Sequence, residues 1–157
     1  MTQKDVETLT KQILESIDRE REREIISRRY GLYDRKETLE QIGELLGITR
    51  ERVRQLEKAT MTRLRMSAEA GELEGLTEFE STLSELLSKL GDISRVSKLS
   101  DELTGETSTK IDQSRLSFIA DLCPTLTIMY DGDNFYQSVA VTDVHNEVKV
   151  TEYVNQI

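Results

Sequence analysis

The chain contains very little of the material from which disulfides, metal centres and membrane spans are built. Its 157 residues include a single cysteine, Cys123, and a single histidine, His145. One thiol excludes an internal disulfide and a cysteine zinc site, and one histidine without a Cys/His cluster supports neither a metal site nor a catalytic triad. No apolar run reaches about 18 residues, so we expect no membrane span.

Motifs of catalysis and of secretion are missing as well. We find no glycine-rich phosphate loop and no nucleophile–base pair, so we expect neither an enzyme nor a cofactor. Asp131 and Asp133 resemble part of a calcium loop, but the other ligands and the closing glutamate are absent, which favours a hairpin turn. The first ten residues, MTQKDVETLT, lack the apolar core of a signal peptide, and together with the sparse cysteine this predicts a reducing, cytoplasmic location.

Charge is distributed unevenly along the chain. The formal net charge is −9, yet residues 1–70 hold 15 basic and 14 acidic residues, a net of +1, whereas residues 71–157 hold 6 and 16, a net of −10. Within residues 49–65, six basic residues stand against Glu51 and Glu57, a local net of +4. Such asymmetry predicts two modules with different partners, and the local basic stretch is the footprint expected of a nucleic-acid contact.

Residues 38–65 read TLEQIGELLGITRERVRQLEKATMTRLR, the pattern of two helices joined by a tight glycine turn. Thr38 and Gln41 form a capping box that predicts a helix over 39–46, which Gly47 ends. Thr49 is placed to cap a second helix over about 50–68. The apolar residues predicted to form the core of this helix-turn-helix are Leu39, Ile42, Leu45, Leu46, Ile48, Val53 and Leu56.

The second of these helices has two faces of different chemistry. One face carries four polar side chains that are candidates for base contacts: Arg50, Glu51, Arg54 and Gln55. At about 100° per residue, apolar residues such as Val53 and Leu56 lie nearly opposite. Arginine can bind guanine through two hydrogen bonds, glutamate accepts from the cytosine amino group, and glutamine pairs with adenine. DNA readout is therefore the leading interpretation, and a solvated surface helix is the alternative.

Residues from about Asp18 to Met66 resemble region 4 of the housekeeping, or sigma-seventy, class of bacterial sigma factors. The resemblance is carried by REREIISRRYGL at 21–32, TLEQIGELLGITRERVRQLE at 38–57 and RLR at 63–65. It implies that the helix beginning at Arg50 reads the minus-35 promoter element in the major groove through the four residues named above. It also implies docking on the flap of the RNA polymerase beta subunit and a bacterial, nucleoid-associated location.

The chain also departs from that family. Nothing in it resembles the upstream regions that melt promoters, and about 90 residues follow the matching stretch. Thr60 and Thr62 stand where the family tends to have Ala and Lys, which implies a weaker phosphate contact late in the helix. The chain is therefore expected to be either the C-terminal piece of a longer factor or a free-standing regulator with the same reading module.

A second set of residues is predicted to contact DNA phosphates, which fixes the register without specifying sequence. The set comprises Thr38, Leu39, Thr49, Arg52, Arg28 and Lys58. Amide groups at the start of the helix capped by Thr38 could hold a phosphate. For Arg28, and for its neighbours Arg29, Arg35 and Lys36, ordinary surface charge is an equal alternative.

The remaining patterns predict two domains. Helices are expected at about 4–17, begun by Thr2 and Asp5, and at about 19–30, capped by Asp18 and carrying charges of alternating sign that indicate a solvated face. Residues 1–70 are then a helix-turn-helix DNA-binding domain, 71–75 (GELEG) a linker and 76–157 an acidic domain. In the latter we expect a helix begun by a Thr77–Glu80 capping box, helices at about 95–104 and 109–122, and strands at 125–130, 135–141 and 147–154 around a turn at 131–134.

The predicted fold class is mainly α, with a four-helix helix-turn-helix domain followed by a small α+β winged-helix-like domain. The acidic domain distantly resembles, in architecture, the winged-helix (HARE-type) domain of the polymerase delta subunit. Its third helix is close to neutral, with Lys110 and Arg115 against Asp112 and Asp121, which favours protein contact over DNA reading. Cys123, at the end of that helix, is expected to be buried packing.

Three functional hypotheses follow from these patterns. The first is a sequence-specific bacterial transcription factor that binds promoter DNA, acts with RNA polymerase and uses its acidic domain for a protein partner. The alternative is a polymerase-binding module that occupies the beta-flap site of region 4 without specific DNA reading. In the third, the acidic half folds back on the basic helix and masks it.

Overall fold

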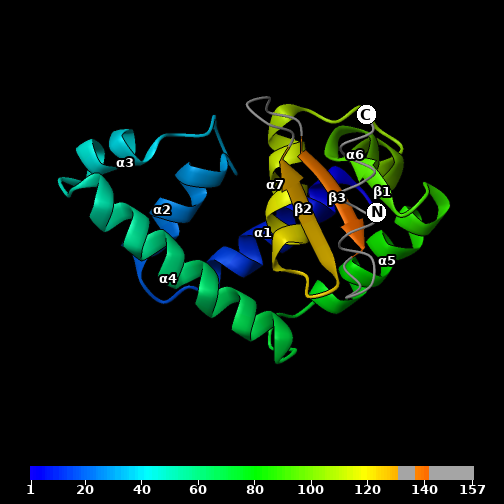
Figure 1. The fold of residues 1–157 in the computed structure, drawn as a ribbon, viewed down its shortest axis with the longest axis horizontal. Coiled ribbons are helices and arrows are strands. Elements are labelled where there is room, and N and C mark those ends of the chain that lie inside the picture. The colour runs from blue at the N-terminus through cyan, green and yellow to red at the C-terminus, as the bar shows by residue number, and fades with distance from the viewer. Residues whose placement is uncertain (131–136, 142–157) are drawn as a thin grey trace.

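The computed structural model describes residues 1–130 and 137–141. Within them the chain forms seven helices and three short strands, which Figure 1 follows in chain order. Their bounds are α1 Gln3–Glu15, α2 Glu20–Tyr30, α3 Leu39–Leu46, α4 Arg50–Glu69, α5 Leu76–Lys89, β1 Ile93–Arg95, α6 Val96–Thr104, α7 Lys110–Leu122, β2 Leu126–Tyr130 and β3 Gln137–Val141. The predicted fold class is confirmed, because the protein is mainly helical with a small antiparallel sheet in its second half.

Local sequence sets most helix starts. α1, α3 and α7 each begin with a capping box, in which a threonine and the third helical residue satisfy one another's backbone amides. The predicted capping box at Thr77 is wrong. α5 begins already at Leu76, which is buried in the core, and Gly75 precedes it in the left-handed conformation at φ 83°. The carboxylate of Glu80 instead accepts from the amide and hydroxyl of Thr125, at 2.9 and 2.7 Å.

α2 differs from its prediction in two ways. Its N-cap is Arg19 rather than Asp18, and no side chain caps the helix. The alternating charges do not all face solvent, because Glu22 is only 6% exposed. Its carboxylate pairs at 2.5 Å with Arg63 of α4 rather than with a neighbour on its own helix. This buried acceptor therefore helps to hold α2 against α4.

The strands form one antiparallel sheet in the order β1-β3-β2. The predicted strands at 125–130 and 135–141 are confirmed as β2 and β3, which pair with Ile128 opposite Val139. β1 has no counterpart among the predicted elements. The predicted turn at 131–134 and strand at 147–154 lie outside the described residues. Helices α5, α6 and α7 combine with this sheet in the winged-helix-like arrangement that the sequence predicts, with β1 before α6 and with β2 and β3 after α7.

Two separate clusters of buried apolar side chains hold the chain together. The smaller consists of Ile25, Ile42 and Val53, one each from α2, α3 and α4, with partly buried residues around them: Leu39, Leu46, Ile48 and Leu56. This confirms the predicted core of the helix-turn-helix except for Leu45, which is 55% exposed. The short helix α3 packs mainly against α2 and α4, on the side of Ile42, so Leu45 is left facing solvent.

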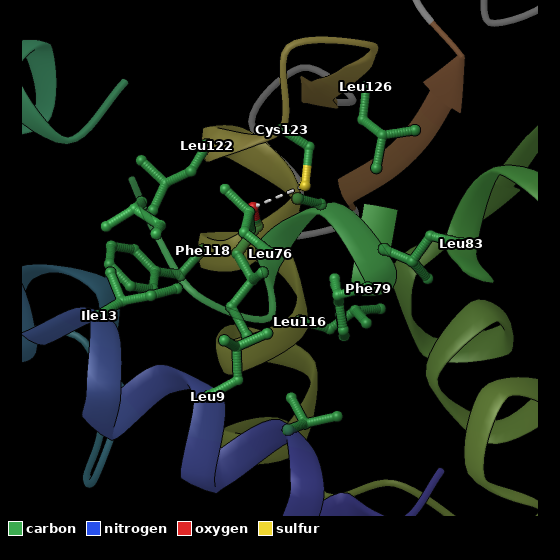
Figure 2. Packing of buried hydrophobic residues seen from close by; sticks show 14 of the residues in the cluster. Leu9, Ile13, Leu76, Phe79, Leu83, Leu116, Phe118, Leu122, Cys123 and Leu126 are labelled. Atoms are coloured by element: carbon green, nitrogen blue, oxygen red, sulfur yellow. Dashed lines mark hydrogen bonds between the residues drawn. The ribbon is translucent and has the colours of Figure 1, made fainter. Parts of the chain in front are cut away.

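The larger cluster joins the two ends of the described chain. α1 packs mainly against α7, and Figure 2 shows Leu9 and Ile13 of α1 beside Leu116 and Phe118 of α7. Leu73 is buried in the same cluster, within the predicted linker 71–75. The division into domains 1–70 and 76–157 remains a proposal, and the apolar packing is continuous across it.

The same cluster confirms the burial of Cys123, which is 2% exposed. Its thiol donates to the carbonyl of Ile119 at 3.3 Å, the contact drawn in Figure 2. Burial raises the pKa of this thiol, so it stays protonated at neutral pH.

Polar contacts also fasten the first half of the chain to α7. Arg115 is 11% exposed and its Nε donates to the carbonyl of Leu32 at 2.8 Å, while its guanidinium lies 5.1 Å from the ring centroid of Tyr33. The rings of Tyr30 and Phe118 lie 5.4 Å apart between centroids. α7, the third helix of the winged-helix-like part, is therefore covered by α1 and by the end of α2 and the loop after it.

Candidate nucleic-acid interface

The turn between α3 and α4 is held by two glycines with different roles. Gly47 ends α3 in the left-handed conformation, at φ 71° and ψ 32°. Gly43 allows a close approach, because a Cβ there would lie 2.7 Å from the carbonyl oxygen of Ile48. The amide of Ile48 donates to the carbonyl of Gly43 at 3.0 Å. The chain is thus folded tightly against α3 before Thr49 starts α4.

The N-terminal part of α4 carries the candidate base-contacting residues on its open side. Thr49 caps the helix by accepting from the amide of Arg52 at 3.1 Å. Val53 is 0% exposed, packed against Ile25 and Ile42. On the other side the candidates are all exposed: Arg50, Glu51, Arg54 and Gln55. The structure therefore brings the four together on one surface, and their role in reading bases stays a prediction.

Two of these four are linked to each other. The guanidinium of Arg54 meets the carboxylate of Glu51 through Nη2 at 2.6 Å and Nε at 3.0 Å, an exposed two-point contact. This contact lowers the pKa of the Glu51 carboxyl and raises that of Arg54. The pair thus offers an ionised acceptor and a charged donor side by side, the two chemistries that the C and G edges require.

The candidate phosphate contacts divide into backbone and side-chain groups. Thr38 and Leu39 stand at the start of α3, where the hydroxyl of Thr38 already accepts from the amide of Gln41 at 3.1 Å. Leu39 packs against the small core, so its backbone rather than its side chain is the group available to a phosphate. Arg52 and Lys58 are exposed on α4. The role of Arg52 and Lys58 in phosphate contact stays a prediction.

Arg28 is in a different situation, because two carboxylates already hold it. Its Nε lies 2.5 Å from Glu24 and its Nη1 lies 2.9 Å from Glu37. The hydrogen bond that Arg28 donates to Glu24 is the main cause that raises the pKa of Arg28, and the one that it donates to Glu37 adds to this effect. Helical spacing can reveal the Glu24 contact, but Glu37 is nine residues away and reaches Arg28 only because the loop after α2 folds back. No pattern in the sequence signals this contact.

Among residues 1–130 and 137–141, no group of three or more His, Cys, Asp or Glu side chains is arranged to hold a metal ion. In the same ranges, none of the helices combines the length and apolar character needed to cross a membrane.

Comparison with known proteins finds similarity in the segment that contains the helix-turn-helix. Residues 19–66 match the family model described as Sigma-70, region 4. Over 46 residues the chain is 56% identical to the RNA polymerase principal sigma factor HrdC of Streptomyces coelicolor, which covers 29% of this chain and 14% of that protein. It is 52% identical over 46 residues to the RNA polymerase sigma factor SigA1 of Synechococcus elongatus, covering 29% of this chain and 12% of that one.

The extent of these matches is small. The chain aligns with only about an eighth of the length of these relatives. The remaining residues, including α5, α6, α7 and the sheet, lie outside the matched family segment. The comparison with solved structures finds no match.

Proposed function

We propose that this chain is a sequence-specific transcription factor that binds promoter DNA and acts with RNA polymerase, because residues 19–66 match the Sigma-70, region 4 family model. In this proposal α4 lies in the major groove of a minus-35-like element. The matched relatives are named as RNA polymerase sigma factors, which supports the assignment to transcription. The site of action would be the bacterial nucleoid, in the cytoplasm.

One observation carries the proposal. The four side chains at the start of α4 are exposed together, within the matched segment, while Val53 on the opposite side is fully buried. A helix held in this way can enter a groove without disturbing its own core. Arg50 and Arg54 would bind guanine, Glu51 would accept from cytosine and Gln55 would contact adenine.

Phosphate contacts would fix the register of this helix. Arg52 and Lys58 are exposed on α4, and the start of α3 at Thr38 and Leu39 offers helix amides. Thr49 caps α4 and is the third candidate region. Such contacts act on every sequence alike, so they supply affinity but no discrimination.

The second half of the chain would then contact a protein rather than DNA. Its third helix, α7, is the element that a winged helix would place in a groove. Residues Leu116 to Ala120 of α7 are buried without exception, and α1 together with Tyr30 packs on that helix. The net charge of −10 over residues 71–157 further disfavours phosphate. We propose two protein partners for the chain. One is RNA polymerase, through its beta flap, and the other is a separate partner of the acidic half.

The contacts between the two halves also test the hypothesis that the acidic half covers the DNA-reading side of α4. Arg65 of α4 pairs with Asp121 of α7 at 2.9 Å, near the C-terminal end of α4. Arg50 and Arg54, at its N-terminal end, are exposed. This arrangement supports an open reading surface over a masked one.

Fluorescence anisotropy of the whole chain tests the proposal. A minus-35-type duplex and a scrambled duplex of equal length would be titrated across a salt series. We expect a clear preference for the promoter duplex and a steep salt dependence. Weak binding without preference, combined with tight binding to polymerase core, would contradict it. That result would favour the alternative, a module that occupies the beta-flap site without reading DNA.

A further inference from the structure

Glu37 ties the start of α3 to the end of α2 by three separate contacts. Its backbone amide donates to the carbonyl of Arg28 at 3.0 Å, and its own carbonyl accepts from Nη1 of Arg29 at 3.2 Å. Its carboxylate accepts from Nη1 of Arg28 at 2.9 Å. Glu37 also stands directly before Thr38, the N-cap of α3. An acidic side chain therefore lies at the point where the proposed DNA contacts of α2 and α3 meet.

At this point Arg28 already has two acidic partners. One guanidinium, that of Arg28, serves the two carboxylates of Glu24 and Glu37, which leaves the group with a net charge of −1. Arg29 is also partnered, since its Nε lies 3.6 Å from Glu57. In contrast, residues 49–65 have a net charge of +4. The guanidinium of Arg28 is thus already held by carboxylates, whereas the adjacent surface of α4 keeps an excess of basic side chains.

The geometry points to a role for Glu37 that no comparison assigns. We propose that its carboxylate occupies Arg28 in place of a DNA phosphate and so limits the affinity of this surface for any duplex. Side-chain exposures of 36% for Arg28 and 22% for Glu37 leave the pair accessible from solvent. The contact between Glu37 and Arg28 does not involve the base-contacting residues of α4. Discrimination between DNA sequences therefore remains with α4. This inference rests on the proposed function, because it presupposes that the surface binds DNA.

A merely structural role for Glu37 makes the opposite prediction. If the residue served only to position α3, weakening its contacts would disturb the turn and reduce DNA binding. The Glu37→Gln substitution separates the two, because glutamine keeps an oxygen that can accept from Arg28 and leaves both backbone hydrogen bonds in place, while the negative charge is removed.

The experiment compares Glu37→Gln with the unchanged protein on the promoter and scrambled duplexes at several salt concentrations. We expect affinity to rise by the same factor on both duplexes, on the order of threefold at low salt. One additional phosphate contact steepens the slope of log affinity against log salt by about 0.9. Between 50 and 200 mM salt, the variant should therefore lose about threefold more of its DNA affinity than the unchanged protein. In an Arg28→Met background the gain should shrink.

A matched control removes the same charge elsewhere. Glu85→Gln lies on the exposed side of α5, in the other part of the fold. This variant reports the effect on DNA affinity of changing the net charge alone. We expect that effect to be small, because the Debye length is about 8 Å at physiological ionic strength and salt screens exposed charges that are farther apart. Thermal unfolding of each variant shows whether the turn is intact.

The outcomes separate this inference from the proposed function. An equal gain on both duplexes with a steeper salt slope supports it. The inference is overturned if Glu37→Gln binds DNA as well as the unchanged protein or more weakly. It is also overturned if the gain in affinity appears on the promoter duplex alone, or if Glu85→Gln gives the same gain. If the unchanged protein shows no preference for the promoter duplex, the proposed function has failed, yet a common gain would still support the role of Glu37. If neither protein binds DNA, both are overturned.

Discussion

The two ends of α4 belong to different parts of the molecule. Near its N-terminus, Val53 packs into a cluster confined to α2, α3 and α4, and the opposite side is open and charged. Near its C-terminus, Met61 and Leu64 join the large cluster that also contains α1, α5 and α7. Figure 1 shows this helix running from α3 towards the start of α5. One helix of 20 residues therefore combines a reading surface with an anchoring surface.

The difference lies in how much apolar packing supports each end. The small cluster contains three fully buried side chains, each worth about 1.5–3 kcal/mol of burial. The other buried apolar side chains of residues 19–66 pack in the large cluster instead, namely Ile26, Leu32, Met61 and Leu64. We infer that the reading end depends on the anchoring end for its stability, and the predictions below test this dependence.

The largest effect is expected for Phe118→Ala in the anchoring end. Phe118 is 0% exposed and packs against Tyr30, so its removal leaves a cavity and should lower the free energy of unfolding by about 3–5 kcal/mol. Urea denaturation followed by circular dichroism measures this. Hydrogen exchange should show that amides of α3 lose protection as well. Full protection in α3 despite a destabilised α7 would show that the reading end is stable on its own.

The next effect concerns the reading end itself. Gly43→Ala would place a methyl group 2.7 Å from the carbonyl of Ile48, and relieving that clash should cost about 1–3 kcal/mol. Gly91→Ala is the control, since it has no atom within 4 Å of the added methyl but does have a positive φ of 92°. Thermal unfolding and DNA affinity should both suffer more from the change at Gly43. An equal loss for both would mean that the close approach at Gly43 costs no more than the positive φ at Gly91.

Arg54→Ala tests the reading surface without touching either core. Its side chain is exposed and pairs with Glu51 on the same helix, so folding should change little. We expect a loss of about 1–3 kcal/mol on the cognate duplex and relaxed selection at one base position. Arg52→Ala should instead weaken all duplexes alike and reduce the salt slope by about 1. Fluorescence anisotropy on a set of duplexes with single-base changes measures the affinity of both variants. If Arg54→Ala loses the same affinity on every duplex, Arg54 does not read a base.

The reading end could largely be predicted from sequence because its determinants are local. The Thr38 capping box, the turn at Gly47 and the cap at Thr49 act within a few residues, and each is found in the structure. The helical period also placed Val53 inside and Arg54 outside. Leu45 is the exception, because the period alone does not tell how wide an apolar stripe the neighbouring helices cover.

The anchoring end was harder to predict because its determinants are distant in sequence. α1 has an apolar face, but only the fold shows that α7 covers it. The three residues of β1 are too few to show a period, and they become a strand by pairing with β3. Glu22 and Glu37 look like ordinary surface charges until the fold brings Arg63 and Arg28 to them. In each case a long-range partner decides the role of a residue.

The smallest effect is expected at the charged contact between α4 and α7. Arg65 and Asp121 lie 2.9 Å apart, but their side chains are 47% and 26% exposed, so solvent weakens the attraction. A double-mutant cycle with Arg65→Ala and Asp121→Ala should give a coupling of about 0.2–1 kcal/mol that decreases with salt. Exchanging the two charges, as Arg65→Asp with Asp121→Arg, should recover most of it. A coupling above about 2 kcal/mol would contradict the expectation that solvent screens this pair. Charge would then add substantially to the apolar contacts of Met61 and Leu64, and salt would weaken this part of the attachment in the same range in which it weakens DNA binding.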